Sequence, residues 1–132
     1  MNAGVPQKLP GTLLILMLVY GAASLLHFVH NAEFLADYPN MPGWLTRAQV
    51  YGVWLGVAVT GVVGYFLIRF GFELLGLMVI AVYAVLGFAG LDHYTLAPVS
   101  AHSAAMNATI WLEVAAAAVL LATTVKRAWS LR

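Results

Sequence analysis

Histidine and carboxylate side chains are the groups in this sequence that could do chemistry, and they gather at two places along the chain. The set comprises His27, His30, His93, His102, Glu33, Asp37 and Asp92. Imidazole and carboxylate ligands together suit a borderline divalent metal such as zinc, copper, nickel or iron. We therefore predict a site that binds a metal ion or a small polar ligand, with the histidines as ligands or proton carriers and the acids orienting or neutralising.

Other kinds of chemistry have little support in the sequence. The chain has no cysteine, which excludes thiolate metal sites, iron–sulfur clusters and cysteine nucleophiles. No HExxH hydrolase motif is present, and nothing around Ser100 or Ser103 indicates a nucleophile elbow or an oxyanion hole. We therefore expect binding, transport or proton-coupled handling of the ligand rather than an enzyme.

Glu113 differs from the other acids because it lies well inside an apolar stretch. A carboxylate inside a membrane span costs several kcal/mol unless it is paired, protonated or facing water, so this side chain should point into the protein. It either only hydrogen-bonds a neighbouring helix or forms part of a proton, ion or substrate path. Expected partners are Tyr20, Thr60 and Tyr83, because no basic residue is predicted at that depth. The buried polar element is then predicted to contain Glu113, Asn31 and Thr109.

The composition indicates which elements must position these residues. Of 132 residues, 63% are apolar and only 8% are charged, whereas about a quarter of an ordinary soluble domain is charged. This balance indicates an integral membrane protein in contact with a lipid bilayer. The net charge of +1 is too small for a nucleic-acid partner.

Apolar runs and helix breakers predict an all-α fold, a single domain over residues 1–132 that forms an antiparallel four-helix bundle. The expected spans cover residues of about 12–38, 47–68, 73–93 and 101–125, each near the 20 or so residues that cross a bilayer. Pro39 ends the first, and Thr46 with Gln49 fits a capping box that starts the second. In such a bundle the histidines of three helices meet at one end.

The basic residues predict the orientation. Arg47 lies at the histidine end, whereas the other end carries Lys8, Arg69, Lys126, Arg127 and Arg132. Because Lys and Arg are retained on the cytoplasmic side, both termini should be cytoplasmic. The histidine cluster would then lie on the outer face, which is periplasmic for a bacterial inner membrane.

Three alternatives to the ligand site remain open. The first is a non-enzymatic membrane subunit or accessory protein that forms a homo-oligomer or docks a membrane-protein partner through the second helix, by a small-residue face of Gly52, Gly56, Thr60 and Gly64. Another is a haem b electron carrier, with two histidines as axial ligands and with Gly87 and Gly90 leaving room for the ring. Lastly, the polar turns could be a solvated exit zone whose side chains pair with one another.

Overall fold

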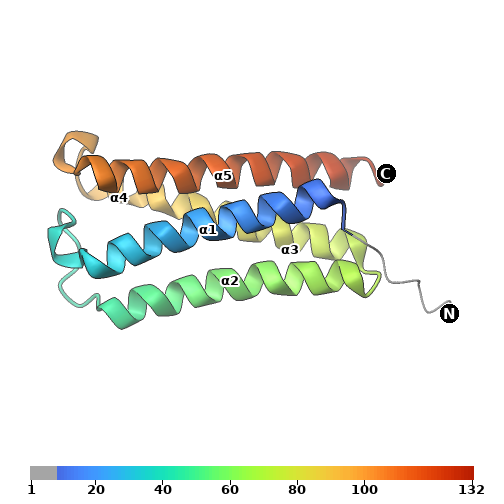
Figure 1. Cartoon of the computed structure of the whole chain (residues 1–132), viewed down its shortest axis with the longest axis horizontal. Helices are drawn as coiled ribbons and strands as arrows, with labels where there is room; N and C mark the ends of the chain where they lie inside the picture. The colour runs from blue at the N-terminus through green and yellow to red at the C-terminus, as the bar shows by residue number, and fades with distance from the viewer. Residues whose placement is uncertain (1–8) are drawn as a thin grey trace.

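The computed structural model describes residues 9–132, a part of the chain that is helical and contains no strand. Four helical segments are long and apolar enough to cross a membrane: Gly11–Glu33, Arg47–Arg69, Glu73–Leu96 and Ala104–Trp129. They lie alongside one another (Figure 1). Their outward-facing side chains are largely apolar, as Ile15, Leu18 and Met78 illustrate. The chain is therefore an integral membrane protein.

The first span is shorter than the sequence predicts. The α-helix α1 covers Gly11–Glu33 and is followed by a 3-10 turn, η1, at Leu35–Asp37. Phe34 leaves the helical conformation with φ −115° and ψ 29°. The prediction of a helix to Tyr38 is thus wrong at its end, because the residue before Pro39 is held in an extended conformation and the chain already tightens at Phe34.

The second span begins where its capping box predicts. Helix α2 covers Arg47–Arg69, and Thr46 accepts a hydrogen bond from the Gln49 amide while the Gln49 side chain accepts one from the Thr46 amide, at 3.3 and 2.8 Å. This confirms the predicted start. A tight turn follows, in which Gly71 has a φ of +92°, a backbone conformation that residues other than glycine rarely adopt.

The third span changes its helical type near the histidine end. Helix α3 covers Glu73–Leu86, continues as the 3-10 segment η2 at Gly87–Asp92, and ends in the short α4 at His93–Leu96. A further 3-10 turn, η3, covers Val99–Ala101. The predicted span of 73–93 therefore contains a stretch of tighter 3-10 helix, which ends at Asp92 near the loops.

Helix α5 covers Ala104–Trp129 rather than the expected 101–125. It begins later because the Ser103 hydroxyl accepts a hydrogen bond from the Met106 amide at 3.2 Å and so caps the helix there. It extends further because Lys126 and Arg127 in the last turn are favourable beside the free carbonyl groups of a helix end.

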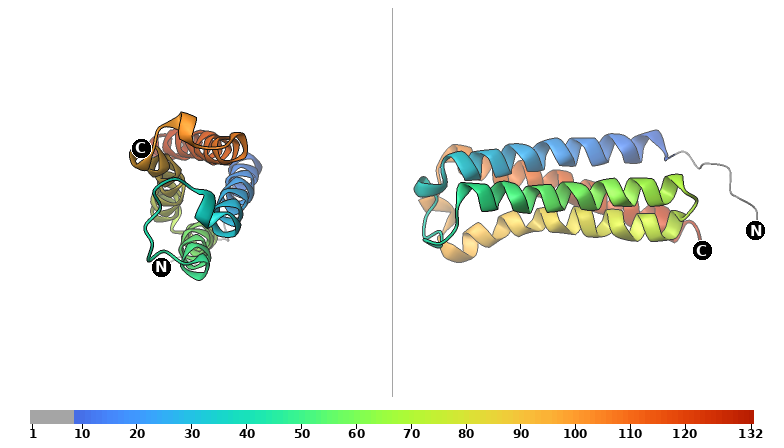
Figure 2. Two further views of the ribbon diagram at one scale, coloured as in Figure 1. Left: turned by 90° about the vertical axis from the view of Figure 1, so that its left-hand side faces the viewer. Right: turned by 90° about the horizontal axis from the view of Figure 1, so that it is seen from below.

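The helices form a ring in the order α1, α2, α3, α5, each packed against two neighbours (Figure 2). The loop after α1 and the segment before α5 lie at one end, which we call the loop end. The start of α1, the α2–α3 turn and the end of α5 lie at the other end (Figure 1). The loop end thus collects the histidine-bearing segments, while Lys8 lies outside the described residues.

The predicted small-residue face of α2 is divided between two environments. Gly64 packs against α3, where a Cβ on Gly76 would lie 2.8 Å from the Gly64 carbonyl oxygen. Gly52 and Gly56 instead lie on the exposed surface with no atom within 4 Å of a Cβ there. Thr60 donates its hydroxyl to the Gly56 carbonyl at 2.9 Å. Within the described bundle Gly64 therefore packs inside, whereas Gly52 and Gly56 face outward.

Candidate functional site

A group of buried polar side chains lies inside the bundle, toward the loop end. It contains His27 and Asn31 from α1, His93 from α4, and Thr109 and Glu113 from α5. Glu113 is 1% exposed and His27 is 3% exposed. These residues are brought together because their helices place one polar stripe each toward the centre. We call this group the inner polar cluster.

His27 and Glu113 form the centre of the inner polar cluster. The Nε2 atom of His27 lies 3.7 Å from Oε2 of Glu113. The Nδ1 atom of His27 lies 3.4 Å from the Thr109 hydroxyl, which already donates its own proton to the Met106 carbonyl at 3.0 Å. Nδ1 must therefore carry the proton that it shares with Thr109, and Nε2 turns toward the carboxyl group.

His27 and Glu113 cannot both present lone pairs to each other, so one of the two side chains must carry an additional proton. A neutral His27 with its proton on Nδ1 presents a lone pair to Glu113, and an ionised carboxylate presents another. Two lone pairs repel each other in a low-dielectric interior, so either Glu113 is neutral or His27 is doubly protonated. The two groups are therefore close enough to influence each other's charge, although 3.7 Å is too long for a hydrogen bond.

Two further histidines hold fixed tautomers near this pair. Asn31 donates from Nδ2 to Nε2 of His93 at 3.0 Å, which leaves the proton of His93 on Nδ1. His102 donates from Nδ1 to the Pro98 carbonyl at 3.0 Å, and its buried Nε2 has no hydrogen-bond partner within residues 9–132. The ring centres of His27 and His93 are 5.4 Å apart, and those of His93 and His102 are 6.1 Å apart. The three histidine rings therefore form a row from the centre of the bundle toward the loop end.

A cavity of about 200 Å³ lies beside this row of histidine rings. Its polar lining comes from His27, Asn31, Asp92 and His93, and Met41 reaches it from the loop after α1. Gly90 lines the cavity as well, and a Cβ there would lie 3.2 Å from Oε2 of Glu113. Cavity and carboxyl group are therefore separated by little more than the width of a glycine.

The remaining predicted site residues lie farther out. Glu33 is partly exposed and accepts hydrogen bonds from Tyr51 at 2.6 Å and Arg47 at 2.7 Å, which joins α1 to α2. Asp37 is exposed, and Asp92 is exposed but lines the cavity. The prediction of one cluster of histidines and acids thus separates into an inner cluster and a surface ion pair, because α1 ends at Glu33 and turns its last acids outward.

His30 contacts a tyrosine from the loop after α1. Its Nδ1 lies 2.9 Å from the hydroxyl of Tyr38, whose ring packs at 4.9 Å from that of His93. Burial raises the pKa of Tyr38 to about 12. Only its position before Pro39 marks Tyr38 in the sequence, yet its contacts with His30 and His93 place it at the loop end of the row of histidine rings.

The expected partners of Glu113 are only partly correct. Thr60 lies on α2 and bonds to its own helix. Tyr20 and Tyr83 are close enough for electrostatic interaction with Glu113, and their rings pack edge to face at 4.6 Å. His27 was not among the expected partners of Glu113, although helical rise places His27 about 9 Å from the end of α1 and Glu113 about 14 Å from the start of α5.

The two glycines that were expected to leave room for a haem ring lie against other side chains. A Cβ on Gly87 would lie 2.6 Å from the Tyr20 ring and 2.7 Å from the Ala117 methyl group, so side chains already fill that position. Gly90 faces Glu113. Within residues 9–132, no three histidine, aspartate or glutamate side chains are grouped so that they could hold a metal ion.

Comparisons with known proteins add no assignment, since no protein-family model, no curated protein and no solved structure matches this chain.

Proposed function

We propose that this chain is an antiparallel four-span membrane protein that binds a small polar ligand at the inner polar cluster, with uptake or release of one proton. The observation that carries the proposal is the His27–Glu113 pair, two ionisable groups 3.7 Å apart within membrane spans. Ionisable residues in spans are rare and costly, and they mark functional sites. Both oxygens of the Glu113 carboxyl group lack a hydrogen-bond partner in the described part of the chain, so they can accept from a ligand.

Access is proposed from the loop end only. The cavity beside the histidines includes Met41 of the loop after α1. On the other side of Glu113 the bundle is filled by apolar side chains, including Leu13, Leu77, Ile80 and Leu120. This packing favours a binding site with one entrance over a continuous channel. With basic residues at the opposite end, the entrance faces the periplasm in a bacterial inner membrane and both termini are cytoplasmic.

The ligand is proposed to be a hydrogen-bond donor of a few heavy atoms, cationic or neutral. The cavity of about 200 Å³ is smaller than the sites of drug-sized molecules. Two acceptors lie at or near the cavity: the side-chain oxygen of Asn31, which lines it, and the Glu113 oxygens, which lie behind Gly90; none of them has a partner among residues 9–132. A transition metal held by two of the histidines and Glu113 is the competing ligand, and the experiment distinguishes it.

The test is ligand-dependent thermal stability of the purified protein in detergent. The probes are methylguanidinium, methylammonium, urea and, separately, Zn²⁺, Cu²⁺ and Ni²⁺. A ligand at 100 times its Kd stabilises the folded state by about 2.7 kcal/mol. We expect an organic donor to stabilise the wild type but not Glu113→Gln. It should still stabilise Glu33→Gln, the matched variant at a surface carboxylate. Equal stabilisation of all three proteins, or of none, would refute the proposal.

Stabilisation by the metal ions but not by the organic donors would instead identify a metal site. If Zn²⁺, Cu²⁺ or Ni²⁺ stabilises the wild type, His27→Ala abolishes the effect and the organic donors do nothing, the site is a metal site.

A second candidate function, an accessory membrane subunit, is favoured by the exposed part of α2. Gly52 and Gly56 leave open space on the lipid-facing surface, into which a partner helix or a second copy could pack closely. A stable partner that co-purifies with the wild type and is lost in Gly56→Leu supports this function. Retention of that partner in Gly56→Leu contradicts it.

A further inference from the structure

A second cavity, of about 480 Å³, lies between α1 and α2 near the middle of the spans. Exposed apolar side chains, such as Leu18 on α1 and Val62 on α2, form its rim, so it opens toward the acyl chains of the bilayer. This volume is within the range of sites for small organic molecules. We call it the lateral cavity.

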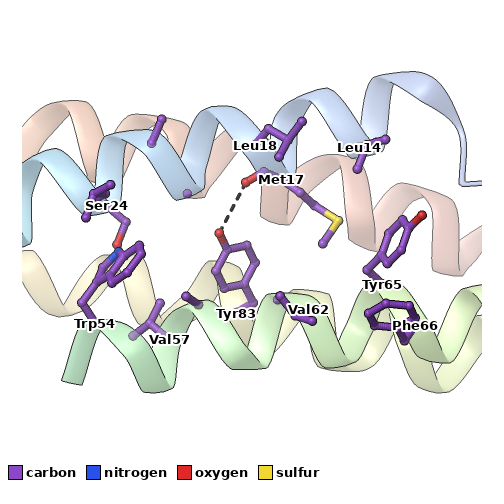
Figure 3. Close-up of a pocket in the computed structure, with 15 residues that line it drawn as sticks. Leu14, Met17, Leu18, Ser24, Trp54, Val57, Val62, Tyr65, Phe66 and Tyr83 are labelled. Atoms are coloured by element: carbon purple, nitrogen blue, oxygen red, sulfur yellow. Dashed lines mark hydrogen bonds between the residues drawn. The ribbon is translucent and has the colours of Figure 1, made fainter. Parts of the chain in front are cut away.

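The inner wall of the lateral cavity carries two hydroxyl groups. Ser24 is 0% exposed, and its hydroxyl has no hydrogen-bond partner within residues 9–132. In Figure 3 this hydroxyl points from α1 into the space between α1 and α2. Tyr83 donates to the Met17 carbonyl at 3.4 Å and keeps its own lone pairs. A buried hydroxyl without a partner costs about 1–3 kcal/mol, which a ligand oxygen would recover.

The rest of the lining determines which ligand class fits. Among residues 9–132, no charged side chain lines the lateral cavity, so a phosphate or ammonium head group would be buried there without a counter-charge from this part of the chain. Four aromatic side chains line it, and their faces and edges favour a planar ring: Trp54, Tyr65, Phe66 and Tyr83. The opening toward lipid leaves room for an apolar tail.

We propose that the lateral cavity binds a neutral, lipid-soluble molecule with a planar oxygen-bearing ring and one apolar tail, the chemical class of the isoprenoid quinones. A ring oxygen accepts a hydrogen bond from Ser24, and the tail leaves between α1 and α2 into the membrane. The Ser24 side chain also lies beside Glu113, so the two sites are neighbours inside the bundle.

Trp54 provides the measurement because it lines the lateral cavity and a quinone quenches indole fluorescence on contact. The reporter protein keeps Trp54 and carries phenylalanine at the other tryptophans, Trp44, Trp111 and Trp129. It is placed in phosphatidylcholine nanodiscs and titrated with a benzoquinone that carries one isoprenoid unit. We expect quenching that saturates, whereas a probe that only dissolves in the lipid quenches in proportion to its concentration.

Two matched variants locate the binding. Ala22 lines the lateral cavity at an exposed position, and Ala22→Phe should weaken the apparent affinity at least tenfold by filling the mouth. Ala118 is exposed on α5 away from the cavity, and Ala118→Phe should leave the affinity unchanged. Equal affinity in both variants, or quenching without saturation, would overturn the proposal.

Ser24→Ala tests the hydrogen bond and remains informative if Ala22→Phe does not fold. Loss of one such bond should weaken binding of the quinone about three- to tenfold. Competition by a hydrocarbon analogue without ring oxygens should be the same in Ser24→Ala and in the reporter protein. If a saturated fatty acid displaces the quinone at equal concentration and Ser24→Ala changes nothing, the lateral cavity holds an acyl chain and the proposal is wrong.

Discussion

Replacing Glu113 with leucine is expected to make the protein more stable while removing its proposed function. The carboxyl group is 1% exposed, and neither oxygen has a hydrogen-bond partner within residues 9–132. A buried polar group in this condition costs about 1–3 kcal/mol, and leucine has a similar volume without that cost. We therefore expect the free energy of unfolding to rise by about 1–3 kcal/mol in Glu113→Leu.

The converse variant should be destabilised. In His27→Leu the carboxyl group of Glu113 loses the one ionisable neighbour that lies within 4 Å of it. The two single variants differ because the imidazole left in Glu113→Leu keeps its Nδ1 contact with Thr109, whereas the carboxyl group left in His27→Leu has no hydrogen-bond partner among residues 9–132; we therefore expect His27→Leu to lose about 1–3 kcal/mol. The double variant should recover most of that loss, with a coupling energy of about 0.5–3 kcal/mol between the two sites.

Glu73→Leu is the control for removing an acid. Glu73 is at the opposite end of the bundle and accepts from Arg127 at 3.0 and 2.7 Å, so its loss should cost up to about 1 kcal/mol. The assay is reversible unfolding in mixed micelles with an increasing fraction of sodium dodecyl sulfate, followed by circular dichroism. Destabilisation of Glu113→Leu by more than about 1 kcal/mol would refute the reasoning, because the carboxyl group would then hold the helices together.

Two other predictions concern packing and pH. Gly76→Ala should destabilise by about 1–3 kcal/mol, because its Cβ would lie 2.8 Å from the Gly64 carbonyl oxygen, whereas Gly56→Ala should change stability by less than about 1 kcal/mol; equal effects in the same unfolding assay would contradict this. Burial raises the pKa of Tyr38 to about 12 from an ordinary value near 10, so its neutral hydroxyl contributes stability that is complete below pH of about 10 and is lost as the pH rises toward 12. Tyr38→Phe should reduce the fall in stability over that interval, and an unchanged fall would show that Tyr38 does not titrate there.

The spans could be predicted from the sequence because lipid contact imposes a long apolar run on each helix. The start of α2 was predictable as well, since a capping box acts within a few residues. The end of α1 was not predictable, because the chain leaves the helical conformation at Phe34 where segments distant in the sequence come into contact. Tyr38 bonds to His30 and packs on His93, which lies on another span.

The site was predictable to a similar extent. Helical spacing places His27 and Asn31 on one stripe, and Thr109 and Glu113 on another, and both stripes are buried. Spacing cannot tell which residue of one helix meets which residue of the next, because that depends on helix rotation and depth. Ser24 carried no signal in the sequence, since its position beside a cavity depends on how α2 packs against α1.

The hydrogen bonds around His27 also determine how ligand binding is linked to protons. Thr109 donates its hydroxyl proton to the Met106 carbonyl, so Nδ1 of His27 keeps its own proton and the proton that can vary is carried either by Nε2 or by Glu113, which lie 3.7 Å apart. A cationic donor that bonds to the carboxylate would displace this proton and bind more weakly at low pH. A neutral donor could bond to Glu113 without displacing it. The pH dependence of binding therefore reports the charge of the ligand.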